Sequence, residues 1–192
     1  MNKKLLLFLL GLVIIPAVVF GIAEPDADAI GKQFAKEHTG GVIGVHTLEE
    51  DITEQEEVRR AVLIIGGTVI DEEPYWKITT DKNHPRIFTD YTIKVDNVIK
   101  GGDKKQVKVT VAGGTLDGVK TKAGAPEITA GDEVIMVLGQ SLESAFKGSY
   151  VPISISKSIY TVNEDGKAEN QYSQRTGDED VVKSRLAELA SP

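Results

Sequence analysis

"AVLIIGGTVI" (Ala61–Ile70) carries the strongest secondary-structure signal in this chain. Its aliphatic and β-branched side chains favour a strand, and the run is too apolar for a strand with one face in water. Gly66 and Gly67 interrupt the run in its middle. Because glycine inside a strand often marks a bulge or a sharp bend, the segment predicts one long, buried strand that bends at these two residues.

The chain after this segment continues with short runs in which apolar and polar residues alternate. In "TDYTIKVDNVIKGG" (89–102) the alternation holds as far as Val95, and the pair 98–99 breaks it, which predicts a second bulge. In "QVKVTVA" (106–112) the valines are expected to face inward and the polar residues, Thr110 among them, outward. The predicted strands lie in 89–100, 106–112 and 134–138 and around Ser154 and Tyr160, with turns at 130–132 and 165–166.

Helices are expected only outside this β region. "DADAIGKQFAKEH" (26–38) predicts a short helix that ends before the glycine pair 40–41. Two capping boxes, each a threonine followed three residues later by glutamate, predict further helix starts. The two pairs are Thr53 with Glu56, before a helix over residues 54–60, and Thr176 with Glu179, before a C-terminal helix.

Strands at short spacing, without long helices between them, are typical of a mainly β domain. The length and the bends within the strands favour a small OB-like Greek-key β-barrel with a short N-terminal helix and a C-terminal helix. The predicted organisation is a signal peptide or anchor in 1–23, an acidic spacer with short helices in 24–57, the barrel in 58–175 and the C-terminal helix in 176–192.

The N-terminal segment predicts export. Lys3 and Lys4 precede an uncharged run from Leu5 to Ala23, and basic residues before such a run stay on the cytoplasmic side. Cleavage after Ala23 would release the domain outside the cell. Without cleavage, residues 5–23 would anchor the domain to the outer face of the cytoplasmic membrane, because about 20 apolar residues span a bilayer.

Charge and composition exclude several classes of function. Residues 1–23 hold two of the 22 basic residues and none of the 29 acidic ones, so the exported part has a net charge of −9. This charge repels phosphate backbones and argues against nucleic acid as a partner. The chain has no cysteine, which excludes disulfides, thiolate metal sites and a cysteine nucleophile.

Two segments resemble catalytic motifs and depart from them at necessary positions. "AGGTLDGVKTKAG" (112–124) is similar to a phosphate-binding loop, but its lysine is out of register and Gly124 and Pro126 leave no room for the following helix. We therefore expect a bend between strands. "GQSLE" (139–143) is similar to a nucleophile elbow, but Glu143 replaces the second glycine.

The remaining residues do not favour a catalytic, cofactor or metal site. The three histidines, at positions 38, 46 and 84, lack metal-ligand spacing. We therefore predict no catalytic residues, no bound cofactor and no metal.

One stretch is a candidate partner-binding loop. "EEPYWKITTDKNHP" (72–85) is polar, and it contains the adjacent aromatic residues Tyr75 and Trp76 together with His84. Exposed aromatic side chains often anchor protein partners. In the alternative interpretation Trp76, the single tryptophan of the chain, closes the end of the barrel and belongs to the core.

The β region resembles a family of uncharacterised exported β-barrel domains of archaea and bacteria. The resemblance covers 58–162, and its motifs are an R-G-x-V strand, a V-x-x-V-x-K-G strand end, a G-G-x-x-x-G bend and a G-A-P-x-F-x-x-G-E-E-V turn and strand. This sequence departs from them at Gly66 (for arginine), Ile128 (for the aromatic residue) and Asp132 (for the first acid). The motifs are structural, so the resemblance implies a fold and no activity.

A fainter similarity links "YTIKVDNVIKG" (91–101) to the netrin-like OB fold of the tissue inhibitors of metalloproteinases. Those inhibitors bind the protease zinc through an N-terminal cysteine, which this chain lacks.

Together these features favour a non-enzymatic domain, exported or membrane-anchored, that binds a protein or a cell-envelope component. Two alternatives remain at this point. One is a protease inhibitor or regulator of the netrin-like OB type that acts by loop insertion, and the other is a hydrolase.

Overall fold

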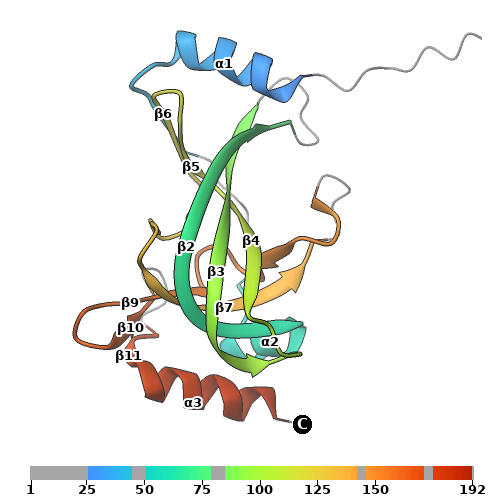
Figure 1. Ribbon diagram of the computed structural model, residues 1–192, viewed down its shortest axis with the longest axis vertical. Helices are drawn as coiled ribbons and strands as arrows, with labels where there is room; N and C mark the ends of the chain where they lie inside the picture. The colour runs from blue at the N-terminus through green and yellow to red at the C-terminus, as the bar shows by residue number, and fades with distance from the viewer. Residues whose placement is uncertain (1–25, 45–50, 79–84, 142–145, 171–174, 192) are drawn as a thin grey trace, which may run out of the picture.

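The computed structural model describes residues 26–44, 51–78, 85–141, 146–170 and 175–191, which form a mainly β structure (Figure 1). Its large sheet has the strand order β11-β10-β9-β7-β2-β3-β4-β8, and β8 also pairs with β7. The strands of this sheet are β2 (Leu63–Lys77), β3 (Arg86–Lys100), β4 (Gln106–Ala112), β7 (Glu133–Gln140), β8 (Tyr150–Pro152), β9 (Ile159–Val162), β10 (Lys167–Glu169) and β11 (Gly177–Asp178).

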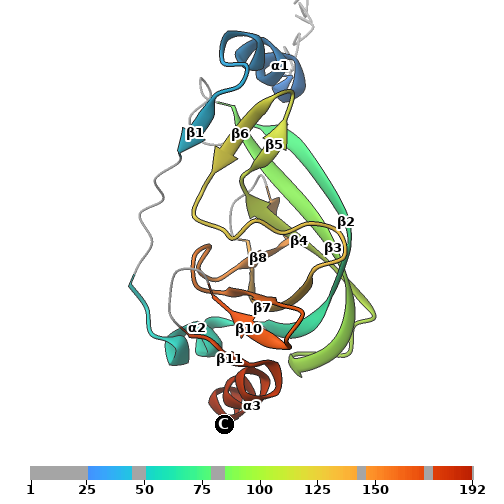
Figure 2. The same ribbon diagram turned by 90° about the vertical axis from the view of Figure 1, so that its left-hand side faces the viewer.

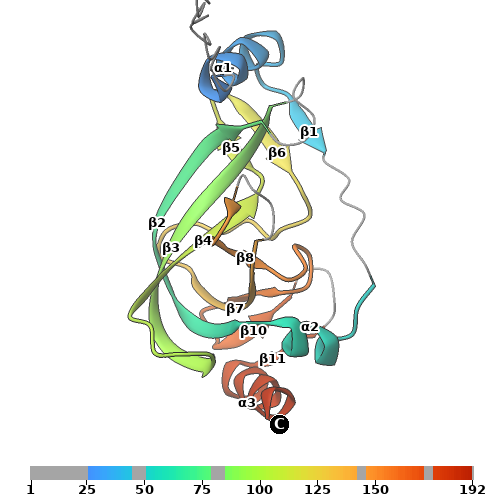
Figure 3. The same ribbon diagram turned by 90° about the vertical axis from the view of Figure 1, so that its right-hand side faces the viewer.

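The long antiparallel hairpin of β2 and β3 runs through most of the molecule and curves around the other strands (Figure 3). Its register shifts between Ile64 and Ile65, between Gly66 and Gly67, and between Val69 and Asp71. The bulges predicted at the glycine pair and near residue 99 are confirmed, since Ile64 pairs with Lys100 and Ile65 with Val98. A side chain on Gly67 would place its Cβ 2.2 Å from the carbonyl oxygen of Lys94, so only glycine allows this close approach.

The loop expected in residues 72–85 is wrong in extent. β2 continues to Lys77, because the backbone from Asp71 onward still pairs with β3, while the polar side chains of this part can remain in water. The connection between β2 and β3 therefore begins only after Lys77.

Two buried clusters hold the large sheet together. The first fills its concave side, and the second lies between the sheet and two helices, α2 (Glu54–Arg60) and α3 (Glu179–Ala190). Residues Val134 to Leu138 of β7 are buried throughout, since they contribute to both clusters, and this agrees with the predicted core strand. The main members of the first cluster are Leu63, Ile65, Val69, Tyr91, Ile93, Val107, Val109, Val111, Met136 and Ile159.

Two predictions within the sheet are wrong. Thr110 is 5% exposed rather than on the surface, because its hydroxyl donates to Asp90 Oδ1 at 2.6 Å. The strand expected around Ser154 lies earlier, as β8, and Ser154 begins a turn that leads to β9.

The short helices follow the predictions, with one difference at α3. α2 spans residues 54–60 as expected, and the Thr53 hydroxyl accepts a hydrogen bond from the Glu56 N–H at 3.2 Å. α3 begins only at Glu179, after an Asp178 N-cap that makes no side-chain hydrogen bond, so the capping box at Thr176 is wrong. The Glu179 carboxylate instead pairs with Lys183 one turn further along α3.

The N-terminal part of the chain packs against the end of the hairpin that holds Trp76 and Ile87. α1 (Ala27–Glu37) is followed by β1 (Val42–Gly44), which joins β6 (Val119–Lys122) and β5 (Gly114–Leu116) in a small sheet (Figure 2). The segment 24–57, expected to be an acidic spacer with short helices, also contributes a strand, which pairs in parallel with β6. β5 and β6 form a hairpin whose two turn residues, Asp117 and Gly118, have φ of 51° and 79°.

The contact between α1 and the hairpin depends on a glycine. A Cβ on Gly31 would lie 2.1 Å from Trp76 Cγ, so the indole ring packs directly on the helix backbone. We expect Gly31→Ala to weaken this packing by about 1–3 kcal/mol, the usual cost of overpacking, partly offset by about 1 kcal/mol of helix propensity. Tryptophan emission should shift to longer wavelength, iodide quenching should increase and Tm should fall.

Gly102→Ala is the matched control, because nothing lies within 4 Å of a Cβ at that position. Emission and Tm that stay unchanged in Gly31→Ala would show that α1 does not pack on Trp76.

Candidate functional site

A cavity of about 680 Å³, partly open to solvent, lies beside the β5–β6 hairpin. Its walls come from the ends of β2, β3 and β4, from the hairpin itself and from the extended segment that follows it. The lining residues are Glu72, Pro74, Thr89, Tyr91, Val111, Ala112, Gly113, Gly114, Thr115, Lys120, Thr121, Lys122, Ala123, Gly124, Ala125, Pro126, Glu127, Ile128, Thr129, Thr161 and Glu169.

The floor of the cavity consists of the buried lining residues Thr89, Tyr91, Val111, Thr121, Ala123, Pro126 and Ile128. Four of these seven are apolar and three carry hydroxyl groups. Burial, assisted by the negative charge of Glu72, raises the pKa of Tyr91 to about 12, so its phenol stays protonated at every physiological pH. The floor is therefore electrically neutral and can both donate and accept hydrogen bonds.

The rim consists of the five charged lining residues, Glu72, Lys120, Lys122, Glu127 and Glu169. Lys120 Nζ lies 2.5 Å from Glu127 Oε1, and Lys122 Nζ lies 3.9 Å from the same oxygen. The hydrogen bond from Lys120 and the charges of both lysines lower the pKa of Glu127, so this carboxylate stays ionised. The charges of the rim thus largely compensate one another.

Glycines let the β5–β6 hairpin lie against β3 and complete the cavity wall. Gly113 and Gly114 have φ of 110° and 135°, values that side chains disfavour. A Cβ on Gly114 would lie 2.3 Å from Thr89 Oγ1, and the Thr89 hydroxyl donates to the Gly113 carbonyl at 2.8 Å. The bend between strands predicted for residues 112–124 is confirmed, and the motif that resembles a phosphate loop is this hairpin.

The structure separates the residues of the candidate partner-binding loop. Trp76 is 4% exposed and packs in a small cluster beneath α1 with Ala35, Ile87 and Val119, while its Nε1 donates to Asp117 Oδ2 at 2.9 Å. This burial agrees with the interpretation of Trp76 as a core residue, although the cluster is separate from the main core of the sheet.

Tyr75 is partly buried, and its hydroxyl donates to Asp90 Oδ1 at 3.2 Å. Burial and the charge of Asp90 raise the pKa of Tyr75 to about 12. His84 lies outside the described residues, so a partner contact through this loop stays a prediction.

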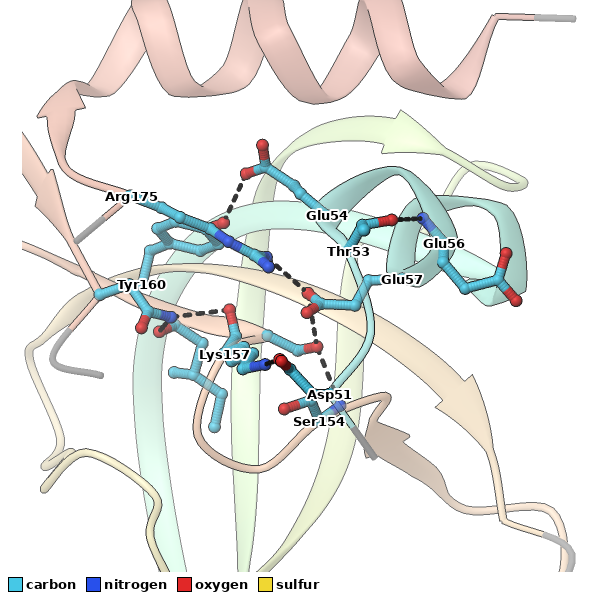
Figure 4. A network of polar contacts seen from close by, with 12 residues as sticks. Asp51, Thr53, Glu54, Glu56, Glu57, Ser154, Lys157, Tyr160 and Arg175 are labelled. Carbon is cyan, nitrogen blue, oxygen red and sulfur yellow. Dashed lines mark hydrogen bonds and ion pairs between the residues drawn. The ribbon is translucent and has the colours of Figure 1, made fainter. Parts of the chain in front are cut away.

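A buried polar network joins α2, α3 and the segment before β9 (Figure 4). Glu57 is fully buried, and its Oε2 accepts hydrogen bonds from Arg175 Nη1 at 3.0 Å and from Ser158 Oγ at 3.3 Å. Beside it, Glu54 Oε1 accepts hydrogen bonds from the Tyr160 hydroxyl at 2.8 Å and from Arg185 Nη2 at 3.0 Å.

This network holds α2 and α3 against the sheet, and its Ser158–Glu57 pair is buried. Ser158 and Glu57 are both 0% exposed, so the Ser158 hydroxyl that donates to the Glu57 carboxylate is shielded from solvent. Glu57 Oε1 and Arg185 Nε are buried without a hydrogen-bond partner. The desolvation of these two atoms therefore lowers the stability of the folded state.

Neither site was foreseen from sequence as a whole. The glycine-rich segment 112–124 was the one local signal for the cavity, and it predicts a bend without predicting what the bend encloses. Ser141, the serine of the motif that resembles a nucleophile elbow, follows the end of β7, and Glu143 lies outside the described residues.

A comparison of the chain with models of known protein families gave no match, and a comparison with curated protein sequences also gave none. Within the described ranges, no group of three or more His, Asp or Glu side chains is placed to hold a metal ion. No helix in the same ranges is long and apolar enough to cross a membrane.

The buried carboxylate of Glu57 predicts a specific pH dependence of stability. Desolvation raises its pKa above the ordinary value of 4.5 more than Arg175 lowers it. Because the folded state then binds this proton more tightly, the stability that Glu57 contributes is present below pH 4.5 and is lost as the pH rises through the folded pKa. In urea denaturation across this pH range, Glu57→Gln should therefore gain stability relative to the wild type as the pH rises.

Glu56→Gln is the control at the neighbouring position, because hydrogen bonds from Arg59 and Arg60 lower the pKa of Glu56 to about 2. Its stability difference from the wild type should stay constant above pH 4.5, the ordinary value for this group. If Glu57→Gln instead lost stability with rising pH, the ion pair with Arg175 would outweigh desolvation.

Proposed function

We propose that this chain is a non-enzymatic, exported or membrane-anchored binding domain for a cell-envelope component, and that the cavity beside the β5–β6 hairpin is its ligand site. The observation that carries the proposal is the cavity itself. Its volume of about 680 Å³ falls within the range of roughly 300–1,000 Å³ that is usual for ligand sites. A neutral floor with hydroxyl groups and a charged rim gives it polar groups that converge on one space.

The chemistry of the lining favours binding over catalysis. None of its residues is serine, cysteine or histidine, so it offers no serine or cysteine nucleophile with a histidine base. The lowered pKa of Glu127 disfavours proton donation by that carboxyl, and the raised pKa of Tyr91 disfavours its use as a base. This reasoning makes the hydrolase the least supported alternative.

For the fold, we propose a closed OB-type barrel within the large sheet. Its support is the circuit of pairings in which β2 joins β3, β3 joins β4, β4 joins β8, β8 joins β7 and β7 returns to β2. All of these pairs are antiparallel except β4 with β8, which meet at Val109 and Tyr150. Five strands in a Greek-key circuit are typical of the OB fold.

The alternative of a protease inhibitor that inserts a loop has less support. The aromatic side chain that would anchor such a loop, Trp76, is 4% exposed and bonded to Asp117. Inhibitors of this kind need an exposed anchor residue at the centre of the contact.

The absence of cysteine from the sequence allows a direct test of the cavity. In Lys122→Cys, a rim position with a 59% exposed side chain, coupling of a bulky maleimide should fill the cavity mouth. We expect this label to reduce the capture of envelope material by the full-length protein at least about tenfold, which corresponds to about 1.4 kcal/mol. Quantitative pull-down before and after labelling gives the measurement.

Val181→Cys with the same label is the control, because Val181 is 57% exposed on α3, at the end of the molecule away from α1 (Figure 1). Equal losses in both labelled variants, or capture that neither label affects, would place binding outside the cavity and refute the proposal.

Export is tested by the N-terminus of the protein in the cell. A cleaved signal predicts mature protein that begins near Glu24 in the external fraction, whereas an anchor predicts intact chain in the membrane pellet. Mass spectrometry of the fractionated protein distinguishes the two. Intact chain in the cytosol would contradict both.

A further inference from the structure

We infer that the ligand of the cavity is a neutral, hydroxyl-rich molecule, and specifically a segment of an uncharged oligosaccharide. This inference rests on the proposed function, since it names the chemical class that the same cavity binds. Three properties of the described lining carry it: the hydroxyl groups, the balance of charge and the protected strand edge.

Six lining residues carry a hydroxyl group. Thr89, Tyr91 and Thr121 lie on the floor, 3%, 8% and 5% exposed. Further hydroxyls come from Thr115, Thr129 and Thr161. The Thr89 and Thr129 hydroxyls already donate to the Gly113 carbonyl and to Asp132 Oδ2, but both can still accept. Because a hydroxyl group can act as donor and as acceptor, such a surface matches a sugar ring, whose own hydroxyls need partners of both kinds.

The charge of the lining disfavours an anionic ligand. The rim holds two lysines and three glutamates, and Lys120 and Lys122 both face the Glu127 carboxylate, at 2.5 and 3.9 Å. A phosphate or carboxylate ligand would have to displace these contacts and would meet a net negative rim. Glu72 and Glu169, in contrast, can accept hydrogen bonds from the hydroxyl groups of a neutral sugar.

The strand edge beside the cavity disfavours an extended peptide. Among the described residues, β2 pairs with β7 only from Leu63 to Thr68, so its later part has an edge that another strand could approach. Pro74 in this part has no N–H, and the Glu72 N–H already donates to Asp71 Oδ1 at 3.0 Å. Two donors that an added peptide strand would need are therefore missing, which is a common protection of strand edges.

The test titrates ¹⁵N-labelled full-length protein with defined probes. The protein is kept in lauryldimethylamine oxide, a detergent without a sugar headgroup. The neutral probes are maltotriose, cellotriose and triacetylchitotriose, with glucose 6-phosphate as the anionic probe and trialanine as the peptide probe. We expect at least one neutral trisaccharide to shift the amide signals of the lining residues Gly113, Gly114 and Gly124, and to leave those of Gly102 and Gly148, which are not lining residues, unchanged.

Two variants assign the contact to the floor. Thr121→Val and Tyr91→Phe remove one hydroxyl each with little change of shape, and each should weaken trisaccharide binding about 2- to 10-fold, as expected for one lost hydrogen bond. Thr92→Val, on β3 outside the lining, should bind as the wild type does. Unchanged binding in both floor variants would overturn the assignment of the floor as the sugar contact.

The probes also separate this inference from the proposed function. Cavity shifts with glucose 6-phosphate or trialanine alone, or with none of the probes, would overturn the oligosaccharide. In that case the proposed function would still stand if the maleimide at position 122 blocked capture, and would fall with the inference if it did not. Glucose is added as a monosaccharide probe. Tighter binding of a trisaccharide than of glucose supports a polymeric glycan as the source, whereas equal binding would overturn the oligosaccharide in favour of a free sugar.

Discussion

The antiparallel pairing of β2 with β3 is the constraint on which the rest of the structure depends. Together these two strands contact α1, α3, β4, β5, β6 and β7, and they bury Leu63, Ile65 and Ile93 in the main core. The register shifts bend the hairpin, so that the half with Lys77 and Arg86 extends away from β7 and toward α1 (Figure 3). Without the close approach of Gly67 to the Lys94 carbonyl, the two halves could not take these different directions.

The half of this hairpin that packs against α1 positions the cavity indirectly. Trp76 is held between Gly31 of α1 and Asp117 at the tip of the β5–β6 hairpin, so one buried side chain joins three segments. Because the indole N–H is bonded to the turn of that hairpin, packing beneath α1 also fixes the wall that carries Lys120 and Thr121. A protein of this size can thus hold a polar cavity without disulfides, since the small third cluster around Trp76 supports it.

At the end of the molecule near α2 and α3, the stabilising contact is a buried ionic network and not the packing of an aromatic ring. Glu57 and Arg175 are removed from water to close α2 over the sheet, and the resulting pair costs desolvation that the hydrogen bonds offset only in part. Such a pair adds little net stability, but its geometry allows only one docking of α2, because a shifted helix would leave two buried charges without partners. The apolar cluster of Val58, Ile64, Tyr160 and Leu186 supplies the favourable energy at this end.

The sequence by itself determined the elements whose signals are local. The apolar run 61–70 with its glycine pair predicts a bent strand, Thr53 with Glu56 predicts α2, and the glycines of 112–124 predict a bend, because each depends on backbone preferences within a few residues. Tertiary structure alone decided where β2 ends, since pairing with β3 keeps polar residues up to Lys77 in a strand that their composition disfavours. It also decided both sites. Arg175 meets Glu57 across 118 positions of sequence, and the cavity collects side chains from Glu72 to Glu169, so no local pattern contains either arrangement.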